Sequence, residues 1–407
     1  MMSRNEWILI VVSALYFIAG TMSSVFVNVY LYAFTGSLYS MTVYAMIRFS
    51  FFPLGFYLGG RLTKYWRLSR VLTLGLSIIT LALALLLSIN SYFNEYPFLI
   101  YSLGFVFGTG EGLFWFSMNS SNLIASSQES RPKFIGTLGI TNSTAMVIAP
   151  FLASLIVAYS VSDISGYIRI FQVVIVVQII AALLSTRLNL VRNQMPYTLK
   201  DKWNLKNDKQ WRYVMTSHFF LGVRDSLILV LTGLLVYNAT GGKGSLYGQL
   251  LTVFALINVF ANFIAAKVIK RNNRIQMYIF GAFILFTSTT VLVLMPNMIG
   301  AIYFGVMNAL GNPFFINPFS IIMMNAIGDY SVNENIYARM IVKEVALDIG
   351  RVLGMSFILI FAFILPESIS LIVSVIVASS FSLILVFYAK AYHHKRDQEK
   401  LELLKAK

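Results

Sequence analysis

The stretch RLNLVRNQMPYTLKDKWNLKNDKQWR, from Arg187 to Arg212, is the longest polar interruption in a chain that is 58% hydrophobic and only 12% charged. Six long apolar runs precede it and six follow it. The stretch mixes Lys and Arg with Trp203, Leu205 and Trp211, which is typical either of a segment on an anionic membrane surface or of a solvated tether. It predicts a cytoplasmic linker between two halves.

The apolar runs on both sides of the linker are about 20 residues long, enough for a helix to cross about 30 Å of hydrocarbon. Soluble domains carry roughly a quarter of charged residues, so the composition excludes an ordinary soluble enzyme. The sequence predicts an all-α polytopic membrane protein with twelve transmembrane helices, the first of them retained rather than cleaved as a signal. The predicted spans are residues 7–32, 41–60, 71–90, 98–124, 136–160, 166–185, 213–237, 246–266, 275–294, 299–322, 340–365 and 368–388.

The placement of the cations orients these helices. The chain has 31 Lys and Arg against 16 Asp and Glu, a net charge of +15. Of the 31 cations, 25 lie in links on one side, Lys243 stands alone on the other, and five lie within spans. The positive-inside rule therefore predicts that both termini are cytoplasmic, in a multi-pass protein of the cell membrane. No stretch is long enough to present the basic face that nucleic-acid binding requires.

The two halves correspond at an offset of about 206 residues, in helix starts and in basic links. A duplicated unit explains this match, and it predicts two pseudo-symmetric six-helix bundles. The predicted division is an N-terminal bundle, the linker, a C-terminal bundle and a charged cytoplasmic tail, at residues 1–186, 187–212, 213–389 and 390–407.

Twelve helices in two duplicated halves, with a basic middle linker, resemble the major facilitator superfamily over nearly the whole chain. That family's signature between helices 2 and 3 corresponds to GGRLTKYWRLSRVL here, in which Gly60, Leu62, Arg70 and Leu72 fit but Lys64 replaces an Asp. A relaxed form of the helix-5 antiporter pattern is present, whereas Gly104 stands where drug antiporters carry an Arg. The helix-5 positions are Ala145, Ala149, Pro150, Ala153 and Ser154.

The resemblance implies alternating access by a monomer. It also implies that helices 1, 4, 7 and 10 line a central cavity, that helices 2, 5, 8 and 11 flank it, and that helices 3, 6, 9 and 12 face lipid. The ionisable residues within the spans follow that plan, since helices 3, 9 and 12 have none in mid-span. Such residues cost several kcal/mol in hydrocarbon, so they require a partner or a water-filled cavity.

Glu111 lies near the middle of the fourth span, with Trp115 and Asn119 following on the same helix face. A carboxyl group in an apolar site binds a proton more readily than one in water, so Glu111 is a candidate for proton coupling or for binding a cationic substrate. The alternative is a structural ion pair with Arg48 of the second span.

The eleventh span carries Glu344, Asp348 and Arg351 on one stripe at helical spacing. Asp348 and Arg351 can pair at i, i+3, which leaves Glu344 for another helix. The stripe is either an interhelical lock or part of a ligand site. Through the 206-residue offset, Asp348 corresponds to Asn142 of the fifth span.

The seventh span carries Arg224 and Asp225 side by side. Adjacent residues do not share a helix face, so each is expected to find a partner elsewhere, and Asp225 is a second candidate for coupling. The tenth span contains Asn312-Pro313 and Asn317-Pro318, and Asn317 corresponds to Glu111 by the offset. Each proline frees a carbonyl that must face protein or a cavity, in a site or in an ordinary kinked helix.

These features predict a secondary active transporter of a small molecule, with proton-coupled efflux of an amphipathic or cationic compound as the leading function. Proton-linked uptake of a small polar solute is the alternative, and a non-transporting receptor or membrane enzyme is a third class. The chain has no Cys, three His and no nucleotide-binding, zinc-protease or hydrolase motif, so we expect no catalysis, cofactor or metal. The expected partners are the substrate, protons and the lipid bilayer.

Overall fold

The computed structural model describes residues 2–93, 95–125, 130–190, 208–228, 232–270, 272–328 and 336–405. This part of the chain is mostly helical and contains no strand. The first half consists of α1 (Arg4–Thr35), α2 (Leu38–Leu62), α3 (Leu68–Ile89), the short turn η1 (Asn90–Tyr92), α4 (Phe98–Ala125), α5 (Arg131–Ala158) and α6 (Asp163–Ser185). Each of the first six predicted spans therefore corresponds to one helix. Most of the predicted linker, residues 191–207, lies outside the described residues.

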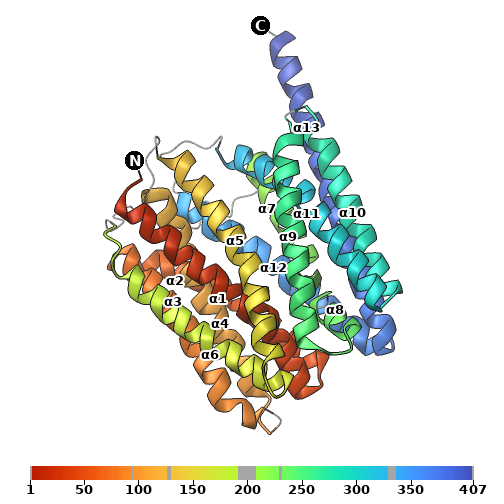
Figure 1. Ribbon diagram of the computed structural model, residues 1–407. Coiled ribbons are helices and arrows are strands. Elements are labelled where there is room, and N and C mark those ends of the chain that lie inside the picture. The colour runs from red at the N-terminus through yellow and green to blue at the C-terminus, as the bar shows by residue number, and fades with distance from the viewer. Residues whose placement is uncertain are drawn as a thin grey trace.

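The second half contains α7 (Lys209–Leu227), α8 (Gly233–Ala239), α9 (Gly244–Val268), α10 (Arg274–Leu294), α11 (Met298–Gly328), α12 (Ile336–Ile364) and α13 (Glu367–Lys405). The predicted seventh span is described as two helices, α7 and α8. The last helix also differs from expectation, because α13 continues through the predicted charged tail to Lys405 and projects beyond the bundle (Figure 1).

Short polar residues begin and end several of these helices. Ser3 and Ser162 form capping boxes at the starts of α1 and α6, and the side chain of Ser37 accepts a hydrogen bond from the backbone N–H of Ser40 in α2. These contacts satisfy N–H groups that a helix leaves free in its first turn. Gly36 ends α1 with φ at 63°, a conformation that favours glycine.

Within the described residues, ten helices are long and apolar enough to cross a membrane. The two remaining predicted spans are the α7–α8 segment and α12, which carry most of the charges found in mid-span. Large apolar side chains stay exposed on the outer helices, such as Leu183 of α6 at 64% and Phe283 of α10 at 59%. Side chains of this kind, facing outward, match a lipid environment. The chain is a multi-pass membrane protein.

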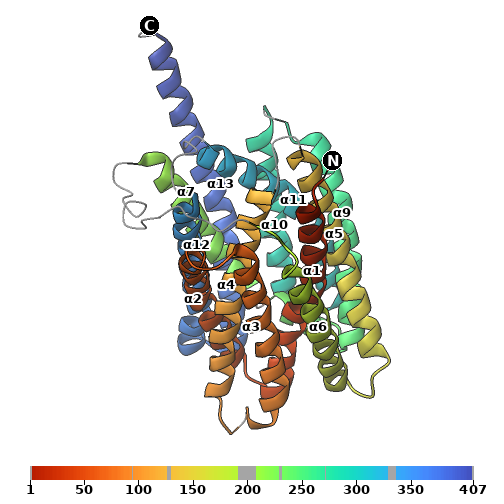
Figure 2. The same ribbon diagram turned by 90° about the vertical axis from the view of Figure 1, so that its left-hand side faces the viewer.

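The helices form two bundles. In the first, α1 packs on α5 and α6, and α4 packs on α2 and α3; in the second, α7 packs on α12, and α10 packs on α11 and α13. One buried hydrophobic cluster lies wholly within residues 211–389 of the second bundle. The bundles meet where α2 contacts α12 and where α5 contacts α9 (Figures 1 and 2).

A glycine stripe fixes how closely α4 approaches α2. A Cβ atom added at Gly104, Gly108 or Gly112 would lie 2.7, 2.0 or 2.1 Å from a backbone carbonyl oxygen of α2. Small residues at this spacing allow two helices to pack backbone against backbone. Glu111, next to this seam, is thereby held opposite α2.

The contacts between the bundles gather at the end of the molecule opposite both termini. There, the backbone N–H of Gly244 in α9 donates to Oδ2 of Asp163 in α6 at 2.7 Å, and the ring of Phe26 lies 6.0 Å from that of Tyr247. Toward the end that carries the termini, an added Cβ at Gly136 of α5 meets nothing within 4 Å. Helices α5 and α9 correspondingly converge away from the termini (Figure 1).

Candidate functional site

A cavity of about 410 Å³ lies between the two bundles. This volume falls within the range of small-molecule sites, about 300–1,000 Å³. Its walls come from α1, α2, α4 and α5 of the first bundle and from α12 of the second. The lining residues are Tyr16, Phe17, Gly20, Thr21, Arg48, Phe49, Phe52, Phe56, Glu111, Trp115, Asn119, Met146, Glu344 and Arg351.

The lining agrees with the family plan only in part. Helices α1 and α4 line the cavity as expected. Among the described residues, however, α7, α8 and α11 contribute no lining side chain, and α12 takes their place from the second bundle. Of the predicted site residues, the cavity brings together Arg48, Glu111, Trp115, Asn119, Glu344 and Arg351.

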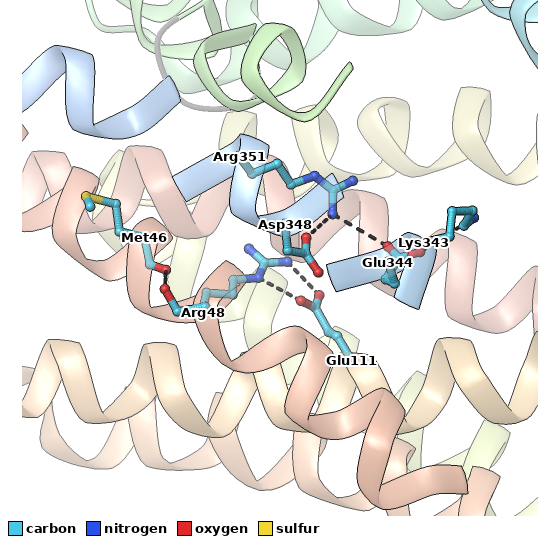
Figure 3. Close-up of polar contacts among 8 residues, drawn as sticks. Met46, Arg48, Glu111, Lys343, Glu344, Asp348 and Arg351 are labelled. Atoms are coloured by element: carbon cyan, nitrogen blue, oxygen red, sulfur yellow. Dashed lines mark hydrogen bonds and ion pairs between the residues drawn. The ribbon is translucent and has the colours of Figure 1, made fainter. Parts of the chain in front are cut away.

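Arg48 and Glu111 form a two-point ion pair across the α2–α4 seam (Figure 3). Nε of Arg48 donates to Oε2 of Glu111 at 2.7 Å, and Nη2 donates to Oε1 at 2.5 Å. Both side chains are largely buried, at 15% and 13% exposed. Paired guanidinium and carboxylate groups of this geometry are mutually satisfied, so the structure favours the ion-pair interpretation of Glu111.

Aromatic rings form the wall next to Glu111. Trp115 and Asn119 share the cavity face of α4 with Glu111, as predicted. The ring of Trp115 meets Tyr16 at 5.6 Å and Phe17 at 5.9 Å, both edge to face. Tyr16 and Phe17 were not predicted from the sequence, because rings make up 15% of the residues and only the packing of α1 on α4 selects these two.

The α12 stripe supplies the second charged group (Figure 3). Nη1 of Arg351 donates to Oδ1 of Asp348 at 2.7 Å, which confirms the predicted i, i+3 pair. The expectation that Glu344 reaches another helix is wrong: its ion pairs are with Lys343 at 3.7 Å and Arg351 at 3.9 Å, on its own helix. The neighbouring turns of α12 bring these cations close enough.

The guanidinium of Arg351 also stacks against α2. Its central carbon lies 4.8 Å from the ring centre of Phe49, which belongs to the other bundle. This cation–π contact joins the two bundles beside the cavity. Asp348 itself is 1% exposed and is not part of the lining.

The prediction for the adjacent pair in α7 is also wrong. Nη1 of Arg224 donates to Oδ1 of Asp225 at 2.7 Å, so the two residues partner each other. Face spacing compares Cβ directions, but the long Arg side chain curls back to reach its neighbour. Arg224 also lies over the ring of Phe315 at 5.0 Å. Asp225 is therefore an ion-paired residue outside the cavity lining.

The predicted asparagines lie away from the cavity lining. Oδ1 of Asn142 accepts from Ser13 at 2.9 Å, and Nδ2 of Asn317 donates to Oδ1 of Asn262 in α9 at 3.2 Å. Asn312 is half-buried in α11 and lines no part of the cavity. Asn142 and Asn317 thus each link two helices within one bundle.

Helix α11 contains Pro313 and Pro318, and a side chain of α9 satisfies a carbonyl that Pro313 frees. Proline lacks the N–H that would bond to the carbonyl four residues earlier, which is that of Ala309. Nδ2 of Asn258 in α9 donates to this oxygen at 3.0 Å. The freed carbonyl thus faces protein rather than a cavity, which was one of the two possibilities that the sequence left open.

Two six-helix bundles around a central, partly charged cavity are the architecture of the secondary transporters that work by alternating access. The chain has the fold of the major facilitator superfamily. Three solved structures share that fold over nearly their whole length.

The nucleoside transporter NupG superposes with a TM-score of 0.71 at 11% identity, covering 95% of this chain and 99% of NupG. The fucose:proton symporter FucP of E. coli gives a TM-score of 0.62 at 13% identity, with 95% and 97% covered. A POT family transporter bound to 5-aminolevulinic acid gives 0.70 at 11% identity, with 95% and 96% covered.

By sequence, the chain is 24% identical over 398 residues to the uncharacterized protein YqgE of Bacillus subtilis (strain 168), which covers 97% of this chain and 91% of the relative. A Geobacillus stearothermophilus protein, the uncharacterized protein in sodM 3'region, is 29% identical over 172 residues, 42% of this chain and 78% of its own. No protein-family profile matches the chain.

Proposed function

We propose that the protein is a monomeric secondary active transporter of the cell membrane that exports an amphipathic, cationic organic compound in exchange for protons. Both termini lie in the cytoplasm in this proposal. The observation that carries it is the cavity of about 410 Å³ between the bundles, which combines aromatic rings with buried carboxylates. Such a site suits an apolar compound that carries a positive charge.

The coupling to protons rests on the carboxylates. A carboxylate in a water-poor site between two bundles is able to hold a proton on one side of the membrane and to release it on the other. The excess of cations in the links on one side supports the orientation. The chain carries no nucleotide-binding loop, which leaves an ion gradient as the energy source.

A pH measurement inside proteoliposomes tests whether protons move with the transported cation, and whether they move in the opposite direction to it. The purified protein is reconstituted with a pH-sensitive dye in the lumen and equal pH on both sides, and ethidium, a permanently charged amphipathic cation, is added outside. An antiporter moves protons out as ethidium enters, so the lumen becomes alkaline. Protein-free vesicles measure the leak. No change of luminal pH with ethidium would contradict proton-coupled export of this class of compound.

Proton-linked uptake of a small polar solute is the second candidate, favoured by FucP, a fucose:proton symporter, and by NupG, a nucleoside transporter. In the same vesicles, a symporter brings protons in with its substrate. External fucose or uridine would then acidify the lumen, whereas an antiporter of cations leaves it unchanged. If no compound moves under any gradient, a non-transporting receptor or enzyme becomes the better account.

A further inference from the structure

We propose that Glu344 is the residue that binds the ammonium group of an organic amine in the cavity, and that it exchanges this group for a proton. The inference rests on the proposed function, because the amine is taken to be the transported compound. It assigns the substrate's charge to Glu344 of α12, whereas the sequence pointed first to Glu111.

The carboxylates differ in how their oxygens are satisfied. Glu111 accepts two hydrogen bonds from Arg48, and Asp348 accepts one from Arg351. Asp225 accepts one from Arg224, away from the cavity. Glu344 lines the cavity and accepts no hydrogen bond from any residue that the structure describes; its nearest cations, on Lys343 and Arg351, lie 3.7 and 3.9 Å away.

This lack of hydrogen bonds matters because Glu344 is 9% exposed. A buried carboxylate without hydrogen-bond donors is costly, and the donors it lacks must come from the cavity side. An ammonium group offers three N–H donors and a charge of the opposite sign. The carboxylate oxygens of Glu344, which accept no hydrogen bond from the described residues, therefore suit an ammonium ligand.

The cationic residues of the lining are less available to an anionic ligand. Arg48 directs two of its nitrogens at Glu111. Nη1 of Arg351 is bonded to Asp348, and its unbonded Nε is buried out of reach. The guanidinium face of Arg351 rests on Phe49. Each of these two cations thus already holds a carboxylate, whereas Glu344 accepts no hydrogen bond within the described part of the chain.

The aromatic wall fits the rest of such a ligand. Tyr16, Phe17 and Trp115 form an edge-to-face cluster, and Phe49 and Phe52 belong to the same lining. Aromatic faces attract organic cations, and they also cover an apolar ring. An aryl-alkyl ammonium compound places its ring on this wall and its charge at Glu344.

Proton exchange follows from the charge at this one carboxylate. Protonated Glu344 and ammonium-bound Glu344 carry the same net charge, so one species replaces the other without leaving a buried charge unpaired. Other charged groups lie on α12 itself and on the helices near it. They are Lys343, Asp348 and Arg351 on α12, Arg48 on α2, Glu111 on α4, and Arg224 and Asp225 on α7.

A matched set of three aromatic compounds tests the assignment in purified protein without any gradient. Naphthylmethylamine, naphthylmethanol and naphthoate share one ring system and differ in charge. Dissociation constants are measured by titration calorimetry over a range of pH, because the amine and the proton compete for the same carboxylate in this proposal. We expect the amine to bind best of the three, and to bind more weakly as the pH falls.

Three variants test whether Glu344 is the residue that binds the amine. Glu344→Gln keeps the shape and removes the charge, and should weaken amine binding by on the order of tenfold to a hundredfold and abolish the pH dependence. Glu344→Asp should restore much of the binding. Glu95→Gln, which removes an exposed carboxylate between η1 and α4 and outside the lining, should change the affinity by less than about twofold. Unfolding temperatures of the empty proteins identify any variant that folds poorly.

Preferential binding of naphthoate, binding of the amine that is unchanged in Glu344→Gln, or no binding of any of the three would each overturn the assignment. These outcomes are separate from the vesicle assay. Amine binding at Glu344 without any flux would contradict the transport function, but the assignment of Glu344 as the binding residue would stand. Proton-coupled flux that Glu344→Gln leaves unaltered in its pH dependence would keep the function and reject the site.

Discussion

At the scale of single residues, the two carboxylates of the cavity lining, Glu111 and Glu344, differ in whether they accept hydrogen bonds. Glu111 accepts two short hydrogen bonds from Arg48, across α2 and α4. Glu344 accepts none from the described residues. In our proposal, the number of hydrogen-bond donors around a carboxylate, rather than its place in mid-membrane, decides its role.

The ion pair of Arg48 with Glu111 predicts strong coupling between two substitutions. Arg48→Met or Glu111→Gln alone leaves one buried partner unsatisfied and should lower the free energy of unfolding by about 3–5 kcal/mol. The double variant should lose clearly less than the sum. Denaturant titration of the purified protein in detergent measures this double-mutant cycle, and additive losses would show that the pair is not coupled.

Sequence reasoning reached some of these residues and not others, for physical reasons. A pair of Arg48 with Glu111 was one of two interpretations that the sequence allowed, because lone charges in apolar spans require partners. Arg224 and Asp225 were not foreseen as a pair, because the spacing rule follows Cβ directions and ignores the reach of an arginine. The cavity rings of Tyr16 and Phe17 could not be singled out, because their selection depends on how α1 packs against α4.

At the scale of helices, glycine and asparagine residues decide how elements approach one another. The apolar runs alone predicted nearly all of the helices. They could not predict that the seventh span is described as α7 and α8, or that α13 continues to Lys405. The close approach of α4 to α2 at Gly104, Gly108 and Gly112 was not predicted, although a spacing of four between small residues is the pattern for close helix packing.

The glycine stripe predicts that Gly108→Ala destabilises the protein, although alanine favours helices. The added Cβ would lie 2.0 Å from the carbonyl oxygen of Arg48, so α4 must move away from α2. Gly136→Ala on α5 is the control, since its Cβ meets nothing within 4 Å. Thermal unfolding should show a clear loss for Gly108→Ala and no loss for Gly136→Ala, which gains up to about 1 kcal/mol of helix propensity. Equal behaviour of the two variants would count against the packing argument.

The contact of Asn258 with α11 predicts that a second substitution restores the stability lost in Asn258→Leu. Asn258→Leu leaves the carbonyl of Ala309 without its donor and should cost about 1–3 kcal/mol of unfolding free energy. Adding Pro313→Ala restores the N–H that bonds to this carbonyl within the helix, so the double variant should recover stability. Chemical unfolding tests the pair; a double variant as unstable as Asn258→Leu would refute the proposed role of Asn258.

At the scale of the whole molecule, the bundles touch at one end and separate toward the other. The duplication and the linker were sufficient to predict two bundles, because they rest on periodic features of the sequence. The end opposite both termini, where the bundles touch, is called the closed end. It could not be predicted from the sequence, because it depends on single contacts such as that of Asp163 with Gly244, residues 81 positions apart in the chain. These contacts must break if the cavity is to open on the side opposite the termini.

The contact of Asp163 with α9 therefore predicts a shift between two states. Asp163→Asn weakens the hydrogen bond to the Gly244 N–H, and Gly244→Ala places a Cβ 2.6 Å from the hydroxyl oxygen of Tyr167. Both should favour opening at the closed end. Ser162→Ala is the control, because Ser162 caps α6 within its own bundle. Spin-label distances across the closed end should lengthen in the first two variants and stay unchanged in the control; no lengthening in any variant would exclude the contact as a latch.

The most direct test of the central claim, alternating access to the central cavity, uses the absence of Cys from the sequence. A single Asn119→Cys substitution places a thiol in the cavity lining, where a membrane-impermeant maleimide reagent is applied from either side. We predict labelling from both sides, and loss of labelling from the side opposite the termini when Asp163→Cys and Gly244→Cys are also present and joined by a short bifunctional reagent. A thiol at position 119 that reacts from one side only in the absence of the crosslink, or that still reacts from both sides when the crosslink is in place, would contradict the account.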